Sequence, residues 1–293
     1  MATVNHASNM YQLDVDSASM PSLNVNQVLD VRSGIGRTLK DEDFFQDNVL
    51  RVTELSISGN MHLDAGHKLL MQNICNDVSG DASIASGFTP ASQLYGSAVT
   101  NSASSLTVVI RPSDHSNQRS LEMAGMVVTN FALSADAGEE GGRYKFSATL
   151  QSGVKPDLDE SAEDSGDPTA GSNVYANDTN VFTATIDSPA IFSGVTSTGY
   201  ELVTRGAETA VTVDTQIKYD GNTKEFIHSF DTQTAPRSGN MFVMTNNNAY
   251  GIDVQNGVFT NVAYAEADIM MLDCSIKSVD DGTDALITFD ISA

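Results

Sequence analysis

Residues 143 to 150 read Arg143-Tyr144-Lys145-Phe146-Ser147-Ala148-Thr149-Leu150, with an apolar side chain at every second position. Successive side chains of a β-strand point to opposite faces of its sheet, so the apolar set would share one face and the polar set the other. Such alternation predicts a strand with one face in the core and one in water, which is typical of antiparallel sheets.

The same alternation recurs along the chain and predicts a mainly β fold. Five further segments show it: Thr53/Leu55/Ile57, Val127/Thr129/Phe131/Leu133, Val211/Val213/Ile217/Tyr219, Met270/Leu272/Cys274/Ile276 and Ala285/Ile287/Phe289/Ile291.

Only two segments indicate helices, and both are short and amphipathic. Asp64 can cap a helix near 67–76, in which residues 70, 71, 74 and 75 share one apolar face. Asn222 and Glu225 fit a capping box ahead of a second helix with apolar residues at 226, 227 and 230. We expect each helix to lie on a sheet.

The order of the expected elements repeats. A strand at 51–58, a helix, a strand at 105–111 and a closing pair at 126–135 and 143–150 make up the first half. The second half offers a strand at 209–219, a helix, a strand at 241–244 and a closing pair at 268–277 and 285–291. This order predicts two duplicated antiparallel β-sandwich or half-barrel modules, each with one short α-helix.

The predicted division of the chain follows from these halves. Residues 1–48 form a polar N-terminal arm, 49–150 the first module, 151–180 an acidic linker or loop, and 181–293 the second module. The linker is rich in Ser, Gly, Asp and Glu and lacks apolar periodicity.

The net charge of the chain argues against a protein that binds the phosphate groups of nucleic acids. Its 293 residues include 38 acidic and 15 basic side chains, a formal net charge of -23. This is the wrong sign for nucleic-acid binding. The chain should repel DNA, over about 8 Å at physiological salt, so the repulsion would matter most inside a narrow channel.

No motif indicates an enzyme, a cofactor or a metal site. The nucleotide-binding, serine-hydrolase and zinc-protease signatures are absent, so we name no catalytic residue. Cys75 and Cys274 are expected to be buried free thiols, and His62 and His67 to be solvated. The acidic run from Asp157 departs from a calcium loop at its sixth position. Nowhere do 18 apolar residues run together, and no secretory signal precedes residue 30.

Several segments resemble the tail tube (major tail) proteins of long-tailed bacteriophages, in the long class with two tube modules per chain. The likeness spans roughly residues 33–293. It is carried by the segments Gly125-Met126-Val127-Val128-Thr129-Asn130-Phe131-Ala132-Leu133-Ser134, Lys145 to Leu150, Ser188-Pro189-Ala190-Ile191-Phe192-Ser193-Gly194 and Tyr219-Asp220-Gly221-Asn222.

The resemblance implies a structural virion protein that assembles in the host cytoplasm and resides in the viral tail. Sheets of neighbouring subunits would join edge to edge into a closed β-barrel, because open sheet edges favour pairing with another chain. Two modules per chain imply a homotrimeric ring with pseudo-sixfold symmetry, and rings stacked head to tail form a hollow tube. Double-stranded DNA would pass through without specific binding, and other tail proteins would be further partners.

Within this picture a few residues are candidates for particular places. Glu54 and Asp214 lie on polar strand faces and are predicted to face the lumen, with solvated carboxylates on the outer surface as the equal alternative. Asp77, Asp81 and Tyr95 belong to a segment expected to bridge one ring to the next.

Other functions remain open at this point. The chain could be another structural virion protein, a capsid-decoration or baseplate component, which shares the β-rich composition. It could also be an extracellular β-sandwich adhesin whose acidic loops bind calcium. An enzyme is the third alternative, although no nucleophile and base can be named.

Overall fold

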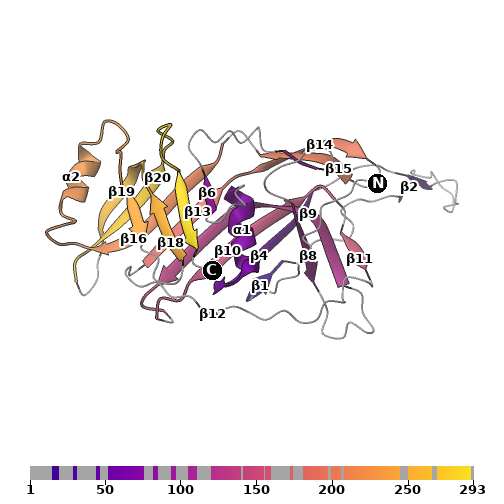
Figure 1. Cartoon of the computed structure of the whole chain (residues 1–293), viewed down its shortest axis with the longest axis horizontal. Coiled ribbons are helices and arrows are strands. Elements are labelled where there is room, and N and C mark those ends of the chain that lie inside the picture. The colour runs from indigo at the N-terminus through magenta and orange to yellow at the C-terminus, as the bar shows by residue number, and fades with distance from the viewer. Residues whose placement is uncertain are drawn as a thin grey trace, which may run out of the picture.

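The structure, a computed structural model, confirms a mainly β fold built of antiparallel sheets with two helices (Figure 1). It describes residues 15–19, 29–31, 44–46, 52–75, 82–84, 94–96, 105–110, 120–139, 141–154, 156–159, 172–173, 181–196, 199–205, 208–244, 250–265 and 269–291.

One large sheet organises the molecule, and every pairing in it is antiparallel. Its main path runs in the order β1-β4-β10-β9-β13-β16-β20-β19. The bounds are β1 Ser17–Ala18, β4 Thr53–Asn60, β10 Lys145–Ser152, β9 Ser120–Asp136, β13 Val181–Asp187, β16 Ala210–Lys218, β20 Met271–Ser278 and β19 Gly257–Ala265. Among the residues described, this sheet is not closed into a barrel.

The long strand β9 takes part in two pairings. Residues 120–126 pair with β8 (Leu106–Ile110) and, in part, with β11 (Asp157–Asp159), whereas residues 127–136 pair with β10 and β13. Gly125 lies near this change of partners with a φ of 67°. Glycine adopts this left-handed conformation without steric cost, so it lets the strand bend from one set of partners to the other.

The alternation that predicted the strands matches the observed burial. All four apolar residues of 143–150 are buried, and so are Leu55 and Ile57 on β4. Met270 is an exception with 57% exposure, because β20 begins only at Met271. Val127 and Val128 are both buried, so β9 is covered on both faces at that point.

The smaller sheets surround the large one. A four-stranded sheet has the order β17-β18-β21-β6, and a three-stranded sheet has the order β14-β15-β7. β12 pairs with β5, and β2 with β3. The bounds are β17 Phe242–Met244, β18 Tyr250–Val254, β21 Ile287–Ile291, β6 Ala82–Ile84, β14 Ala190–Thr196, β15 Gly199–Arg205, β7 Leu94–Gly96, β12 Ser172–Asn173, β5 His62–Leu63, β2 Leu29–Val31 and β3 Phe44–Gln46.

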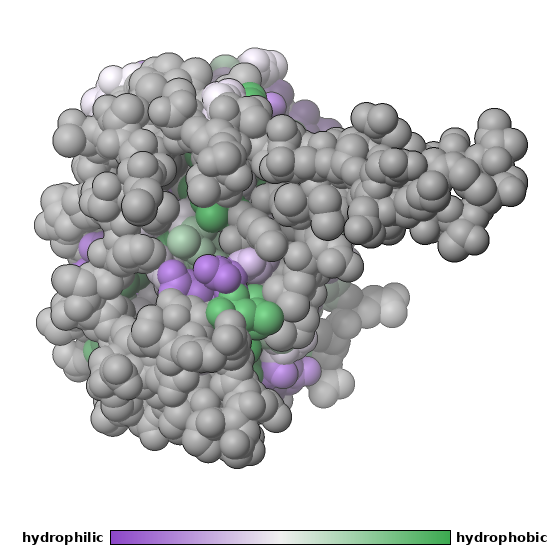
Figure 2. Space-filling view, turned by 90° about the vertical axis from the view of Figure 1, so that its right-hand side faces the viewer, coloured by the Kyte–Doolittle hydropathy of each residue, from purple (hydrophilic) through white to green (hydrophobic). Residues whose placement is uncertain are grey.

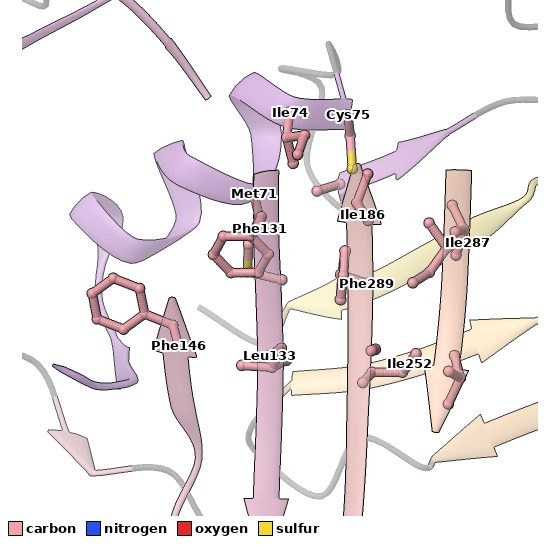
Figure 3. Close-up of a cluster of buried hydrophobic side chains, with 14 of the residues drawn as sticks. Met71, Ile74, Cys75, Phe131, Leu133, Phe146, Ile186, Ile252, Ile287 and Phe289 are labelled. Carbon is pink, nitrogen blue, oxygen red and sulfur yellow. The ribbon is translucent and has the colours of Figure 1, made fainter. Parts of the chain in front are cut away.

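The hydrophobic core lies between the large sheet, the four-stranded sheet and the first helix (Figure 3). Phe131 of β9 meets Phe289 of β21 edge to face, with 6.2 Å between ring centroids. Tyr144 and Phe182 form a second such contact at 5.7 Å. One core cluster therefore contains residues from both halves of the chain.

The two helices differ in how they begin and pack. α1 (Ala65–Cys75) contacts β9 and β6, and the N–H of His67 donates to Asp64 Oδ1 at 2.9 Å, which confirms Asp64 as its cap. α2 (Glu225–Asp231) contacts β19 but buries no residue completely. The predicted capping box is wrong: Lys224 occupies the N-cap position without a side-chain hydrogen bond, and Asp220 Oδ1 accepts from the N–H groups of the preceding turn.

Two predicted segments turn out differently. The strands expected to form the second closing pair, β20 and β21, lie in different sheets, and β20 forms its hairpin with β19. The N-terminal arm contributes β1, which pairs with β4 through Ser17 opposite Ser58 and Ala18 opposite Ile57.

Candidate functional site: the polar face and open edges of the large sheet

One face of the large sheet points away from the core and carries small polar side chains. Since the core-facing residues of each strand are buried, their neighbours form this outer face. Its neutral polar members are hydroxyls and amides: Ser56, Ser58, Asn130, Ser134, Ser147, Thr149, Gln151, Thr183, Thr185, Thr212, Gln216 and Ser275. The register also places apolar residues on this face, namely Val127, Ala132, Val181 and Ala210. Of these, Val127 is covered, because it packs against Val203 of β15.

Carboxylates on this face are held by neutral donors on the adjacent strand. Gln151 Nε2 donates to Glu54 Oε2 at 2.8 Å, and the two residues lie directly opposite each other. Ser275 Oγ donates to Asp214 Oδ1 at 2.5 Å in the same way. Gln216 Nε2 donates to Asp273 Oδ1 at 2.9 Å. These partners fix the carboxylates without neutralising their charge.

The described strands place more negative than positive charge on this face. The acidic residues are Glu54, Asp136, Asp187, Asp214 and Asp273, and the basic ones are Lys145, Lys218 and Lys277. Lys145 and Lys277 pair with Glu139 and Glu208 at 3.6 Å and 3.4 Å. Exposed pairs of this kind contribute little to stability, about 0–1 kcal/mol. The face is therefore mildly anionic and mostly hydroxylic.

The structure places Glu54 and Asp214 on this same face, both exposed, with β10, β9 and β13 between their strands. Asp77 and Asp81 lie outside the described residues. Tyr95 belongs to β7, which pairs with β15, with Tyr95 opposite Val203. This strand of the first half thereby joins a hairpin of the second.

Within the described residues the main path ends in β1 and β19, which have one strand partner each. The outer edge of β19 is already bonded at Gly257 by the backbone of Arg237 and at Phe259 by the side chain of Gln233, so only its later residues, 261–265, are considered an open edge. Ser17 and Ala18 of β1 are exposed, as are Asn261, Ala263 and Tyr264 of β19. An unpaired edge presents a row of backbone N–H and C=O groups that can add a strand from another chain. Sequence patterns missed β1 because a two-residue strand has no periodicity to detect.

Exposed large hydrophobic side chains are spread over several elements. They are Val15, Val52, Leu158, Ile191, Phe230, Val243, Tyr264, Ile269 and Met270. In the space-filling view of Figure 2, hydrophilic and hydrophobic side chains of the described residues lie next to one another. Three of the nine gather at the β19–β20 connection.

The two neighbouring histidines are buried, so the prediction of solvated rings is wrong. His62 is 6% and His67 0% exposed, and their ring centroids are 5.6 Å apart. His62 belongs to β5 and His67 to the first turn of α1, so their spacing of five spans a strand-to-helix turn rather than one helix. His67 Nδ1 lies 2.8 Å from Asp64 Oδ1, and its ring stands edge-on to Phe146 at 5.1 Å.

Both cysteines are buried free thiols, as predicted. Burial raises the pKa of Cys274 to about 11, with the charge of Asp273 as the smaller cause. In the part of the chain that the structure describes, no group of three or more His, Cys, Asp or Glu side chains could hold a metal ion. No helix in that part is long and apolar enough to cross a membrane.

The polar face and the two open edges are thus the candidate functional surfaces of the described structure. No known family model matches this chain, and no curated protein matches it either. The functional proposal below therefore depends on these surfaces and on the order of the strands that build them.

Proposed function

We propose that this chain is the tail tube subunit of a tailed bacteriophage, a structural protein that forms stacked rings around a channel for DNA. The observation that carries the proposal is the order of strands in the large sheet. It can be read as the same four-stranded unit twice, β1-β4-β10-β9 followed by β13-β16-β20-β19.

The two units share their connections as well as their order. In the first unit, β1 is followed by the hairpin β2–β3 and then by β4, which pairs with β1. In the second unit, β13 is followed by the hairpin β14–β15 and then by β16, which pairs with β13. A helix follows, α1 or α2, and later a hairpin closes the unit. The second strand of that hairpin, β10 or β20, pairs with the strand before the helix.

Two tube modules per chain account for this repetition. The second module then closes with β19–β20, which replaces the pair of strands expected from the sequence. Both closing hairpins carry a register irregularity, between Thr149 and Leu150 in one and between Phe259 and Asn261 in the other. A bulge increases local twist and helps a sheet to curve.

Ring formation would satisfy the two open edges. Each added backbone hydrogen bond contributes about 0.5–1.5 kcal/mol net, so a seam of several bonds supports stable assembly. Three chains with two units each would form a closed barrel with pseudo-sixfold symmetry. Contacts between rings are heterologous and do not close, so they extend into a filament.

The polar face would line the channel. The described strands place five acidic side chains and three lysines among the hydroxyls and amides of this wall, so its net charge is negative and would repel phosphates at short range. Double-stranded DNA would slide through without specific binding, and other tail proteins would meet the ends of the tube. The proposed location is the virion, after assembly in the host cytoplasm.

Electron microscopy of the purified full-length chain tests the proposal. We expect rings or tubes with a central hole at high protein concentration. A chain that stays monomeric at high concentration and across a range of salt would contradict it. Unassembled protein that loses many degrees of thermal stability when calcium is chelated would instead support the adhesin alternative.

A further inference from the structure

We propose that residues 232–237, in the connection between α2 and β17, cover the start of the outer edge of β19 and keep it from adding a strand of a second copy. These residues are called the cover segment below. The side chain of Gln233 takes the place of the backbone of a neighbouring strand. The inference goes beyond the proposed function, because it concerns the part of β19 that lies outside its open edge and does not depend on rings.

Gln233 satisfies both outward backbone groups of Phe259. Its Nε2 donates to the C=O of Phe259 at 3.1 Å, and its Oε1 accepts from the N–H of Phe259 at 3.0 Å. A glutamine amide offers the same kinds of donor and acceptor as a peptide group. Phe259 is therefore bonded on this side as if another strand were paired with it.

Arg237 bonds the outward groups of Gly257 through its own backbone. The N–H of Arg237 donates to the C=O of Gly257 at 2.8 Å, and its C=O accepts from the N–H of Gly257 at 3.1 Å. In an antiparallel sheet the backbone groups of every second residue point to the same side of the strand. Gly257 and Phe259 are consecutive members of that series, so neither N–H is free for an incoming strand.

Ring contacts hold the cover segment and α2 over the same residue. The ring centroid of Phe226 on α2 lies 5.6 Å from that of Phe259. The guanidinium carbon of Arg237 lies 5.8 Å from the centroid of the Phe259 ring, and Phe259 itself is buried. The contacts of the cover segment thus converge on residues 257 and 259.

The cover segment is attached at few points. All of its residues except Gln233 are exposed, and α2 before it buries no residue completely. After it, the chain is fixed again at Gly239, whose N–H donates to Asn256 Oδ1 at 3.2 Å. Loss of the two Gln233 bonds should therefore loosen the cover segment without unfolding the sheet beneath it.

The sequence of β19 explains why this edge needs a cover. The strand has nine residues and no charged side chain: Gly257-Val258-Phe259-Thr260-Asn261-Val262-Ala263-Tyr264-Ala265. Long uncharged edge strands pair with other chains, and proteins protect them with charges, bulges or a covering loop. The other end of the sheet, β1, needs less protection because it has only two residues.

Pro236 makes the cover segment itself a poor edge. Its ring nitrogen carries no hydrogen, and the residue is exposed. A strand that approached from outside the cover segment would lack a hydrogen-bond donor at this position. The cover segment therefore ends the sheet on this side rather than extending it.

Gln233→Ala in the full-length chain tests the inference with two measurements. Hydrogen exchange followed by mass spectrometry reports whether the N–H of Phe259 is freed, and light scattering over a concentration series reports the association of copies. Gln233→Glu keeps an acceptor for that N–H but loses the donor to the C=O. Gln216→Ala is the matched control, because it removes an amide that donates to Asp273 on the polar face, away from this edge.

We expect Gln233→Ala to exchange faster at Phe259 and to associate at an about tenfold lower protein concentration than the unsubstituted chain, because two hydrogen bonds are lost. Gln233→Glu should fall between these two, and it carries the comparison if Gln233→Ala does not fold. Gln216→Ala should match the unsubstituted chain. Scattering is recorded below the unfolding temperature of each variant, so that unfolded chains do not contribute.

Association of the Gln233 variants at the same concentration as the unsubstituted chain would overturn the inference, whether or not exchange is faster. Earlier association without faster exchange at Phe259, or an equal shift in Gln216→Ala, would overturn it as well. Ring formation by the unsubstituted chain tests the proposed function separately. An absence of rings would contradict that function and leave the comparison of these variants intact.

Discussion

Glu54 on β4 and Gln151 on β10 lie directly opposite each other, and the amide donates a 2.8 Å hydrogen bond to the carboxylate. The acid is thereby fixed in place by a neutral partner, which brings no positive charge to offset it. Asp214 and Ser275 repeat the arrangement on the other half of the sheet. A surface meant to neutralise acids would place lysine or arginine at these positions.

Reversing the charge at Glu54 and Asp214 should increase the affinity of the assembled protein for DNA. Glu54→Lys with Asp214→Lys should make rings bind a short DNA duplex in low salt and release it as salt rises, because each lysine displaces counterions from phosphate. Fluorescence anisotropy of a labelled duplex measures this. The matched control, Glu54→Gln with Asp214→Asn, removes charge without reversing it and should bind far less. Tight DNA binding by the unsubstituted protein at physiological salt would contradict the account.

Removing the cap of α1 should destabilise the fold. Asp64→Ala deletes the acceptor of the His67 N–H and leaves the buried His67 Nδ1 without its carboxylate, so we expect a loss of about 1–3 kcal/mol. Denaturant unfolding followed by circular dichroism measures the difference. Asn222→Ala is the control and should be close to neutral, because Asn222 does not cap α2. Equal losses in the two variants would be inconsistent with the observed caps.

Gly125 should resist substitution because of its backbone. Gly125→Ala forces a side chain into a left-handed conformation at φ 67°, at an expected cost of about 1–2 kcal/mol. Space alone does not prohibit the change, since the added Cβ would lie 3.4 Å from Ser152 Oγ. Gly221→Ala is the matched control: it has open space and no positive φ, and should not destabilise. Equal unfolding midpoints would show that the bend in β9 does not need glycine.

The buried thiol of Cys274 should be unreactive in the folded protein. Its pKa of about 11 means that little thiolate forms at pH 8, so alkylation should proceed only after unfolding. Because the folded pKa lies above the ordinary value of 9.0, folding holds the proton more tightly, and stability should fall as pH rises from about 9 to about 11. Mass spectrometry after timed alkylation, with and without denaturant, measures the reactivity. Rapid labelling of native Cys274 would contradict its burial.

Local sequence patterns correctly predicted many of the strands, their buried faces and one helix cap. The alternation in 143–150 marked a strand and its buried face correctly, because the period of two is a property of the strand itself. Asp64 was identifiable as a cap for a similar reason, since the interaction spans only three residues.

Contacts between distant segments were not predictable in this way. The pairing of β20 with β16 and β19 rather than β21 depends on which edges are free in the folded sheet. His67 is buried where it meets Phe146, which lies far along the chain, and the ring of His62 lies next to that of His67. The open edges became visible only once the register of β1 and β19 was known.

Electron cryomicroscopy of particles from the concentrated full-length chain tests the central claim most directly. The account predicts rings of three copies in which the four-stranded unit recurs six times around one closed barrel, with the polar face inside and β1 beside β19 of the next copy. Single copies in which β1 and residues 261–265 of β19 are covered by their own chain, or rings whose polar face points outward, would contradict it.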